Sequence, residues 1–415
     1  MNNSILENID NPIGLEQVYR SNKSQFKRSF FELFPSRPES PVALCWYERL
    51  QSENSSIAWG KGSDLLFISM AAILAAAIAK IPDFFPIGMD FFYPRNISFI
   101  VLPMLAAYFA WLQKLPLKTT ITVLLLFVSA AVFINWLPLP LTSDTMLLSC
   151  IHLPLVGWSL LGFIYTGGHL RNWERRPDFL RYNGDLLVMG SLIVSGIMLL
   201  TGITIGLFDL IGLSIAEFYT KWILIVELAA APLIATYVIR YNPQLVNKVS
   251  PVIARIFSPV VLITLVAYLI GIAIAKKDPF NDRDFLLLFN GLLIGVLAII
   301  FFSVVELQRS TESKLAYWII FLLALVTILV NGIALSAILY RIGSWGFTPN
   351  RTAVLGGNIL FFVNLLFIAY RLSRQVRGLS TTGQEIEKSI AQFLPIYSAW
   401  AIVVTFLFPL IFGMR

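Results

Sequence analysis

The sequence predicts an all-α fold, a polytopic bundle of about eleven transmembrane helices. Of the 415 residues, 57% are hydrophobic and only 13% are charged, about half the charged share of an average soluble domain. The apolar residues also occur in long runs, and about 20 helical residues are needed to cross roughly 30 Å of hydrocarbon. Gly and Pro lie largely within or beside these runs, as is common in membrane helices.

The chain is expected to begin with a basic cytoplasmic or interfacial segment, residues 1–62, ahead of a transmembrane helical domain, residues 63–415. No short apolar stretch with a small-residue cleavage site precedes the first span, so that span is expected to act as the targeting signal. From Gly14 to Phe34, apolar residues recur at loose helical spacing beside Lys27 and Arg28. This pattern suits a helix on an anionic inner leaflet or one packed on the bundle's own loops. The prolines from Pro35 to Pro41 indicate a linker.

The transmembrane helices are predicted from the apolar runs, with boundaries that carry an error of about two to four residues. The stretch from Leu207 to Ala216 is compatible with a re-entrant turn. The eleven runs are 63–80, 97–113, 119–137, 146–165, 184–206, 219–239, 254–275, 284–306, 315–340, 353–371 and 391–412.

Orientation follows from the basic residues, because cytoplasmic loops retain Lys and Arg. With the N-terminus inside, most of the 31 Lys and Arg residues fall in inside segments. This bias predicts a cytoplasmic N-terminus and an external C-terminus at Arg415, with the bacterial inner (plasma) membrane as the location. The basic residues are scattered at the ends of apolar runs and are not grouped on one face, which argues against nucleic acid as a partner.

Metal, disulfide and cofactor chemistry have little support in the sequence. Cys45 lies in the polar leader and Cys150 in an apolar run, and no Cys or His spacing resembles a metal site. His169 has no second His nearby in the chain. No cofactor and no metal are expected.

Glu227 is the clearest anomaly, because it interrupts an apolar run without a Lys or Arg one turn away. An ionised carboxylate in hydrocarbon is costly, and such residues by default suggest function. Pro232, one and a half turns later, frees a backbone carbonyl. The two hypotheses are a proton or cation site and a protonated Glu bonded to the alanine-rich surface at Ala229–Ala231.

Three asparagines lie in separate apolar runs: Asn290, Asn331 and Asn364. Hydrogen bonding between helices is favoured over a polar substrate pathway for them. The spacings Gly202–Gly206 and Gly291–Gly295 match GxxxG, a pattern that permits close helix approach and is weak evidence of dimerisation. A homo-oligomer or another membrane protein is therefore kept as a candidate partner beside the lipid bilayer.

A cluster of arginines and aromatic residues separates the fourth and fifth predicted spans. Arg175 and Arg176 lie there with Trp173 and Phe179. Guanidinium groups beside aromatic rings at a membrane interface are suited to anionic lipid phosphates. Ordinary topology anchoring is the favoured alternative.

The connection between the ninth and tenth spans, Tyr340–Asn358, is the most distinctive segment. Thr348 is expected to cap a helix that begins at Pro349. The free amides of that helix, with Arg341, Asn350 and Arg351, form a candidate anion or lipid-headgroup site. Because an Arg in the first turn opposes the helix dipole, a partner is expected. A phosphate and an acidic side chain are the alternatives, the second slightly favoured, and the acidic candidates are Asp209, Asp282 and Asp284.

The same segment resembles the DUF4153 family of uncharacterised bacterial multi-pass membrane proteins. The matching residues are Arg341, Ile342, Trp345, Gly346, Phe347, Thr348, Asn350 and Arg351, and Ile205–Tyr219 is similar to the family's hairpin between two spans. The resemblance covers about residues 180–375. It implies a polytopic membrane fold and directs attention to Arg341, Asn350 and Arg351 without naming a ligand.

Three functions are compared on this basis. The preferred hypothesis is a transporter or permease-like protein for a small solute, ion or lipid, with Glu227 as the coupling site. The alternative is a non-transporting assembly or sensory module that binds protein partners or anionic lipid. An intramembrane enzyme is disfavoured, because the sequence has no HExxH, GxSxG or paired acidic motif.

Overall fold

The computed structural model describes residues 2–34, 40–53, 60–138, 140–169, 173–247, 249–275, 283–307, 314–379 and 383–413. The chain divides into two compact units, Met1–Gly60 and Lys61–Arg415, close to the boundary expected after residue 62. Every regular element in the described ranges is a helix, so the all-α prediction is confirmed.

The N-terminal unit contains four helices: α1 (Asn2–Glu7), α2 (Pro12–Ser21), α3 (Lys23–Leu33) and α4 (Pro41–Glu53). The single amphipathic helix expected from Gly14 to Phe34 is instead broken at Asn22. This residue ends α2 and caps α3, since its Oδ1 accepts the amide hydrogen of Gln25 at 3.1 Å. Pro41, expected in a linker, begins α4, whereas Pro35 and Pro38 lie outside the described residues.

The apolar residues of this leader form a core of their own. Leu15, Phe26 and Phe30 are fully buried, and Tyr19 contacts Phe26 and Trp46 with ring centroids 5.5 and 5.3 Å apart. These side chains are therefore not available to lie on a lipid surface. The segment 1–62 is also not basic overall, because its seven basic residues are balanced by seven acidic ones. The basic residues are Arg20, Lys23, Lys27, Arg28, Arg37, Arg49 and Lys61, and the acidic ones are Glu7, Asp10, Glu16, Glu32, Glu39, Glu48 and Glu53.

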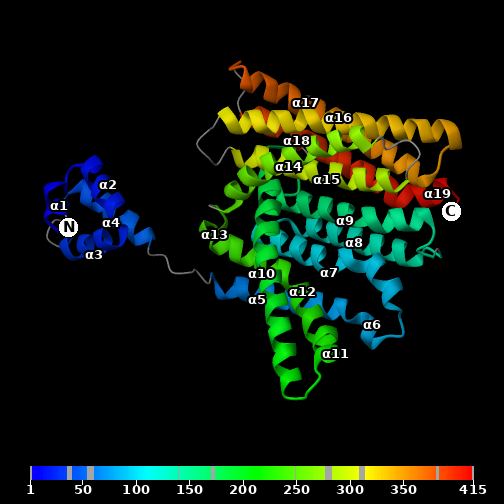
Figure 1. The fold of residues 1–415 in the computed structure, drawn as a ribbon. Helices are drawn as coiled ribbons and strands as arrows, with labels where there is room; N and C mark the ends of the chain where they lie inside the picture. The colour runs from blue at the N-terminus through cyan, green and yellow to red at the C-terminus, as the bar shows by residue number, and fades with distance from the viewer. Residues whose placement is uncertain are drawn as a thin grey trace. The chain divides into compact units, whose positions relative to one another are not determined.

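The second unit is the membrane unit (Figure 1). Its elements are α5 (Gly62–Ala79), α6 (Ile81–Phe84), α7 (Met89–Leu112), α8 (Leu117–Trp136), α9 (Asp144–Tyr165), η2 (Trp173–Arg175), α10 (Arg176–Leu210), α11 (Ala216–Phe218), the π-helix η3 (Tyr219–Leu224), α12 (Ile225–Tyr241), α13 (Gln244–Asn247), α14 (Val249–Ala275), α15 (Arg283–Leu307), α16 (Lys314–Trp345), α17 (Pro349–Val376), α18 (Gly383–Ile402), the π-helix η4 (Val403–Leu407) and α19 (Phe408–Ile411).

Ten helical segments in the described ranges are long and apolar enough to cross a membrane. The remaining predicted span, 254–275, is part of α14, in which the apolar stretch identified is Arg255–Gly271. The helices α10 and α18 begin eight residues earlier than predicted, at Arg176 and Gly383, and so does α7, which begins at Met89 rather than 97. Its first turns contain Arg95 and Asn96, whose polarity hid them from an apolar-run search, although both are buried. The chain is a multi-pass membrane protein.

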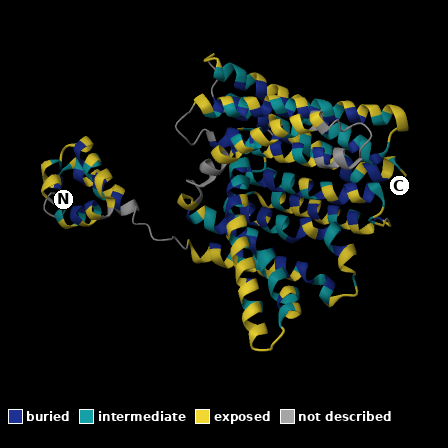
Figure 2. Cartoon of the chain, in the orientation of Figure 1, coloured by how far each residue is buried: buried dark blue, intermediate teal, exposed yellow. Residues whose placement is uncertain are grey.

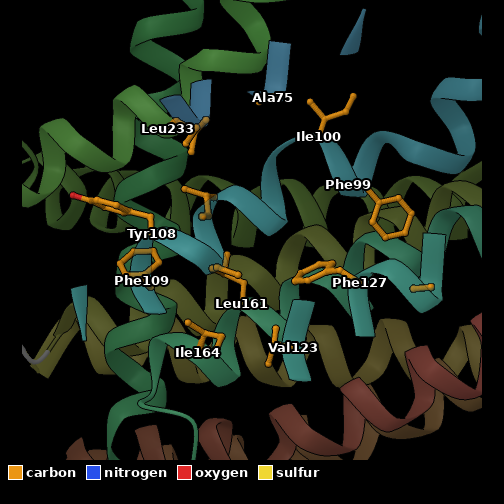
Figure 3. Close-up of a cluster of buried hydrophobic side chains, with 14 of the residues drawn as sticks. Ala75, Phe99, Ile100, Tyr108, Phe109, Val123, Phe127, Leu161, Ile164 and Leu233 are labelled. Carbon is orange, nitrogen blue, oxygen red and sulfur yellow. The ribbon is translucent and has the colours of Figure 1, made fainter. Parts of the chain in front are cut away.

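Two hydrophobic cores hold the membrane unit together. The first joins α5, α7, α8, α9, α12 and the start of α10. Figure 3 shows part of it, with Tyr108 and Phe109 of α7 beside Leu161 of α9 and Phe127 of α8. The second joins α14 to α18. The two groups meet because α9 packs on α17 and α18, and α10 packs on α15 and α18.

The α10–α12 hairpin extends beyond the neighbouring helices of the membrane unit (Figure 1). Its tip is a turn with Gly212 at φ +79°, which follows the end of α10 at Leu210; that Leu207–Ala216 is a re-entrant turn stays a prediction. The distal half of α10 is largely exposed (Figure 2), as expected of a surface that faces lipid.

The two GxxxG patterns are not used for helix packing within the described structure. A Cβ atom added to Gly202, Gly206, Gly291 or Gly295 would meet no heavy atom within 4 Å.

Candidate functional site

Two cavities flank the first turns of α10. The larger, here called the apolar cavity, has a volume of about 620 Å³. It lies between α8 and α18, with α9 behind it and the start of α10 beside it. Its lining residues are Lys118, Thr119, Thr122, Val123, Leu126, Val156, Trp158, Ser159, Leu160, Gly162, Phe163, Thr166, Gly168, His169, Arg176, Phe179, Leu394, Pro395, Ser398, Ala399 and Ile402.

The apolar cavity has one cationic end. Lys118 is in the first turn of α8, His169 follows the end of α9, and Arg176 begins α10. From this end, α8 lines the cavity as far as Leu126, a rise of about 12 Å at 1.5 Å per residue. This length approaches the hydrocarbon depth of one leaflet, about half of 30 Å.

The body of the apolar cavity offers few free polar groups. The hydroxyls of Ser159, Thr166 and Ser398 donate to backbone carbonyls of their own helices at 2.7, 3.0 and 2.9 Å. Trp158 donates its indole Nε1–H to Asn183 at 2.8 Å. No Asp or Glu of the described residues lines this cavity.

The second cavity, here called the polar cavity, has a volume of about 530 Å³. It lies at the ends of α7, α9 and α12, against the first turns of α10. Its lining residues are Phe109, Leu112, Gln113, Tyr165, Arg175, Asp178, Arg181, Tyr182, Asp185, Thr236, Ile239, Arg240 and Pro243.

A cluster of aromatic rings lies between the two cavities. Phe179 lines the apolar cavity, whereas Tyr165 and Tyr182 line the polar one. The ring of Tyr165 is 5.4 Å from that of Phe179 and 5.2 Å from that of Tyr182, measured between centroids. A Cβ atom added to Gly162 would lie 2.7 Å from Phe179, so a glycine is required for this ring to pack against α9.

The structure separates the two arginines that the sequence treats as one lipid-phosphate site. Arg175 lines the polar cavity and is exposed. Arg176 lines the apolar cavity, and its Nη1 donates to the carbonyl of Ala391 at 2.7 Å, which ties α10 to α18. Adjacent positions on a helix point about 100° apart, so neighbours in sequence readily enter different cavities.

Glu227 lies in the first turn of α12, directly after the π-helix η3. The side chain is half-buried, and its Oε2 atom has no hydrogen-bond partner among the described residues. Pro232 is inside the same helix, where a proline leaves a backbone carbonyl without its helical hydrogen bond, as the sequence analysis expected. Glu227 lines neither the apolar nor the polar cavity, so neither connects it to water.

The intramembrane asparagines bond between helices. Asn358 donates to Asn290 Oδ1 at 2.8 Å, and Asn331 donates to the carbonyl of Asn358 at 3.2 Å, joining α15, α16 and α17. Asn364 donates to the Tyr397 hydroxyl of α18 at 2.7 Å. These contacts are the interhelical bonds that were favoured over a substrate pathway. The sequence analysis did not single out Asn358 as an intramembrane asparagine, because this residue follows two glycines near the start of its span and does not interrupt a long apolar run.

The Arg351 guanidinium finds its partner in the C-terminal end of α16. Its Nη1 donates to the carbonyls of Trp345 and Gly346 at 2.9 and 2.8 Å. Thr348 caps α17 as expected, accepting from the Arg351 amide at 3.3 Å. Carbonyls at a helix C-terminus carry partial negative charge, so the arginine is stabilised there without an acidic side chain or a phosphate. Of the acidic candidates, Asp282 and the side chain of Asp284 lie outside the described part of the structure.

Arg341 approaches the same tryptophan, with its guanidinium 5.5 Å from the centre of the Trp345 ring. Asn350 lies in the first turn of α17 and is half-buried. The Arg351 guanidinium lies 5.7 Å from the centre of the same ring. The arrangement fixes the α16–α17 connection, and anion binding by this segment stays a prediction.

A buried ionic cluster at the far end of α5 was missed altogether. Asp83 lies between Lys80 and Lys221, and the Lys221 Nζ is 3.2 Å from Asp83 Oδ1. The Lys80 Nζ also donates to the carbonyl of Lys221 at 2.6 Å and lies 4.2 Å from the centre of the Trp222 ring. The two ammonium groups, Lys80 first, hold the pKa of Asp83 below the usual range of an aspartate. The cluster ties α5 and α6 to η3.

The two histidines lie on α9 and just after its end. His152 has its Nδ1 atom 2.9 Å from the carbonyl of Leu148, and His169 lies at the apolar cavity described above. Among the described residues, no three His, Cys, Asp or Glu side chains are grouped so that they could hold a metal ion.

Comparison with known proteins adds no relative to this picture. No family model matches the chain, and no curated protein or solved structure matches it either. The resemblance to DUF4153 therefore stays a prediction. The two cavities at the start of α10 are the candidate binding sites of the chain.

Proposed function

We propose that this multi-pass membrane protein binds an anionic lipid in the apolar cavity, with the phosphate at Lys118 and Arg176. The observation that carries the proposal is the shape of the cavity: one cationic end and an apolar body about as deep as one leaflet. With the predicted orientation, the cationic end faces the cytoplasm. The bound lipid would then come from the inner leaflet of a bacterial inner membrane.

Binding of anionic lipid belongs to the module hypothesis, and lipid transport would be an additional activity. The transporter hypothesis placed its coupling site at Glu227, which lines neither cavity. Transport is tested separately in vesicles that contain a labelled phosphatidylglycerol. A rate of leaflet exchange above that of protein-free vesicles, lost in Glu227→Gln, would support it.

The binding proposal is tested with lipids that carry bromine on their acyl chains and quench tryptophan fluorescence. Trp158 lines the apolar cavity, so the part of the quenching that disappears in Trp158→Phe reports on occupancy of this site. We expect that part to be larger with brominated phosphatidylglycerol than with brominated phosphatidylcholine. Equal signals from the two lipids would count against an anion-selective site.

Lys118→Gln is expected to weaken phosphatidylglycerol binding about fivefold, since one basic residue near a membrane surface contributes about 1 kcal/mol. Lys114→Gln is the matched control, because Lys114 is also exposed and does not line the cavity. A second variant, Ala399→Leu, fills the apolar body and should reduce binding of both lipids. If Lys114→Gln weakened binding as much as Lys118→Gln, the attraction would be a general surface effect and the proposal would fail.

A further inference from the structure

The polar cavity is a separate site from the apolar cavity, and its chemistry differs. Five of its thirteen lining residues are charged: Arg175, Asp178, Arg181, Asp185 and Arg240. Only two of the twenty-one residues that line the apolar cavity are charged, Lys118 and Arg176. Because burying charged groups against hydrocarbon is costly, this lining suits a polar, soluble molecule and not an acyl chain.

The charges around the polar cavity are only partly paired. Asp178 is held by Arg181 at 2.7 Å, and Arg181 also binds Glu387. Asp185 is only 5% exposed and already has a partner. The carboxylates of the cavity are thus occupied within the protein.

Two guanidinium groups keep donors for a ligand. Arg175 forms no ion pair with any residue that the structure describes. Arg240 has its Nε 3.7 Å from Asp64 Oδ2, beyond hydrogen-bond distance, and that oxygen already accepts the hydroxyl of Tyr241. Both arginines line the same cavity. Guanidinium groups bind phosphate and carboxylate with paired, charge-assisted hydrogen bonds.

We propose that the polar cavity binds a small soluble molecule that carries a phosphate or carboxylate group, through Arg175 and Arg240. The volume of about 530 Å³ is in the range of sites for small organic ligands, about 300–1,000 Å³, and is larger than inorganic phosphate needs. The rings of Phe109, Tyr165 and Tyr182 provide an apolar wall for the remainder of the ligand. This site does not depend on the lipid proposal.

The test is equilibrium dialysis of inorganic phosphate and of glycerol phosphate against the full-length protein in a neutral detergent. We expect saturable binding that is tighter for glycerol phosphate. Arg175→Gln and Arg240→Gln should each weaken it about tenfold, the loss of one charge-assisted hydrogen bond. Arg377→Gln is the matched control, an exposed arginine at the end of α17, and should change affinity less than twofold.

Lys118→Gln separates this proposal from the lipid site. It should leave glycerol phosphate binding unchanged and weaken only the phosphatidylglycerol signal. The opposite pattern, in which Lys118→Gln abolishes glycerol phosphate binding and Arg175→Gln does not, would assign the anion to the apolar cavity and overturn the proposal. So would an absence of saturable binding at millimolar concentrations. Melting temperatures of the unliganded variants show whether a loss of binding reflects a loss of folding.

Discussion

Asp83→Asn is expected to lower the free energy of unfolding by about 3–5 kcal/mol, the usual cost of leaving one member of a buried ion pair alone. The side chains of Lys80 and Asp83 are only 5% and 1% exposed, so the Lys80 ammonium would remain in the protein without its counter-charge. Unfolding in mixed detergent micelles measures the loss. Lys221→Gln is the control, because the Lys221 side chain is 42% exposed and an exposed pair contributes about 0–1 kcal/mol.

The same cluster predicts a pH dependence. The pKa of folded Asp83 lies below that of an unfolded aspartate, about 3.9. Its contribution to stability is therefore complete above that value and is lost as the pH falls through the folded pKa. The difference between wild type and Asp83→Asn should stay constant from about pH 5 to pH 8 and shrink below about pH 4. A difference that instead shrank between pH 5 and 8 would contradict this assignment.

Arg181→Leu is the second change with a large expected effect, again about 3–5 kcal/mol. Arg181 bonds to Glu387 on α18 as well as to Asp178 on its own helix. Glu387 is 7% exposed, so the substitution leaves its carboxylate buried without the guanidinium. Unfolding in mixed micelles is again the measurement.

A double variant separates the ion pair from simple packing at this position. Arg181→Leu with Glu387→Leu removes both charges and should recover most of the stability, because apolar replacement of a whole buried pair is often neutral. Asp178→Asn should cost less than about 1 kcal/mol, since that side chain is 58% exposed. A double variant no more stable than Arg181→Leu alone would show that the pair is not the source of the effect.

The membrane helices could be predicted from the sequence because a bilayer imposes one requirement on every span. Each must present about 20 mostly apolar residues, and this signal is local. It failed at α7, where Arg95 and Asn96 are buried by contacts with other residues: Arg95 lies over the Phe91 ring, and Asn96 exchanges hydrogen bonds with Asn135 of α8. The polarity of Arg95 and Asn96 in the sequence did not indicate that their side chains contact Phe91 and Asn135 inside the protein.

The candidate sites were harder to predict, because their partners are distant in sequence. Arg181 and Glu387 are 206 residues apart, and Lys80 and Lys221 are 141 apart. The periodicity of one helix contains no information about such pairs. Arg351 shows a different limit: its partner is the backbone of α16, and carbonyl groups have no sequence signature. The leader likewise had a helical pattern, but the pattern alone did not indicate that four short helices bury it together.

The most direct test of lipid binding is an experimental structure of the protein in nanodiscs that contain phosphatidylglycerol. We expect elongated density in the apolar cavity between α8 and α18. Its headgroup should lie within hydrogen-bond distance of Lys118 or Arg176, and its chain should run toward Val156. A cavity closed by direct packing of α8 on α18, or one that stays empty at saturating lipid, would contradict the account.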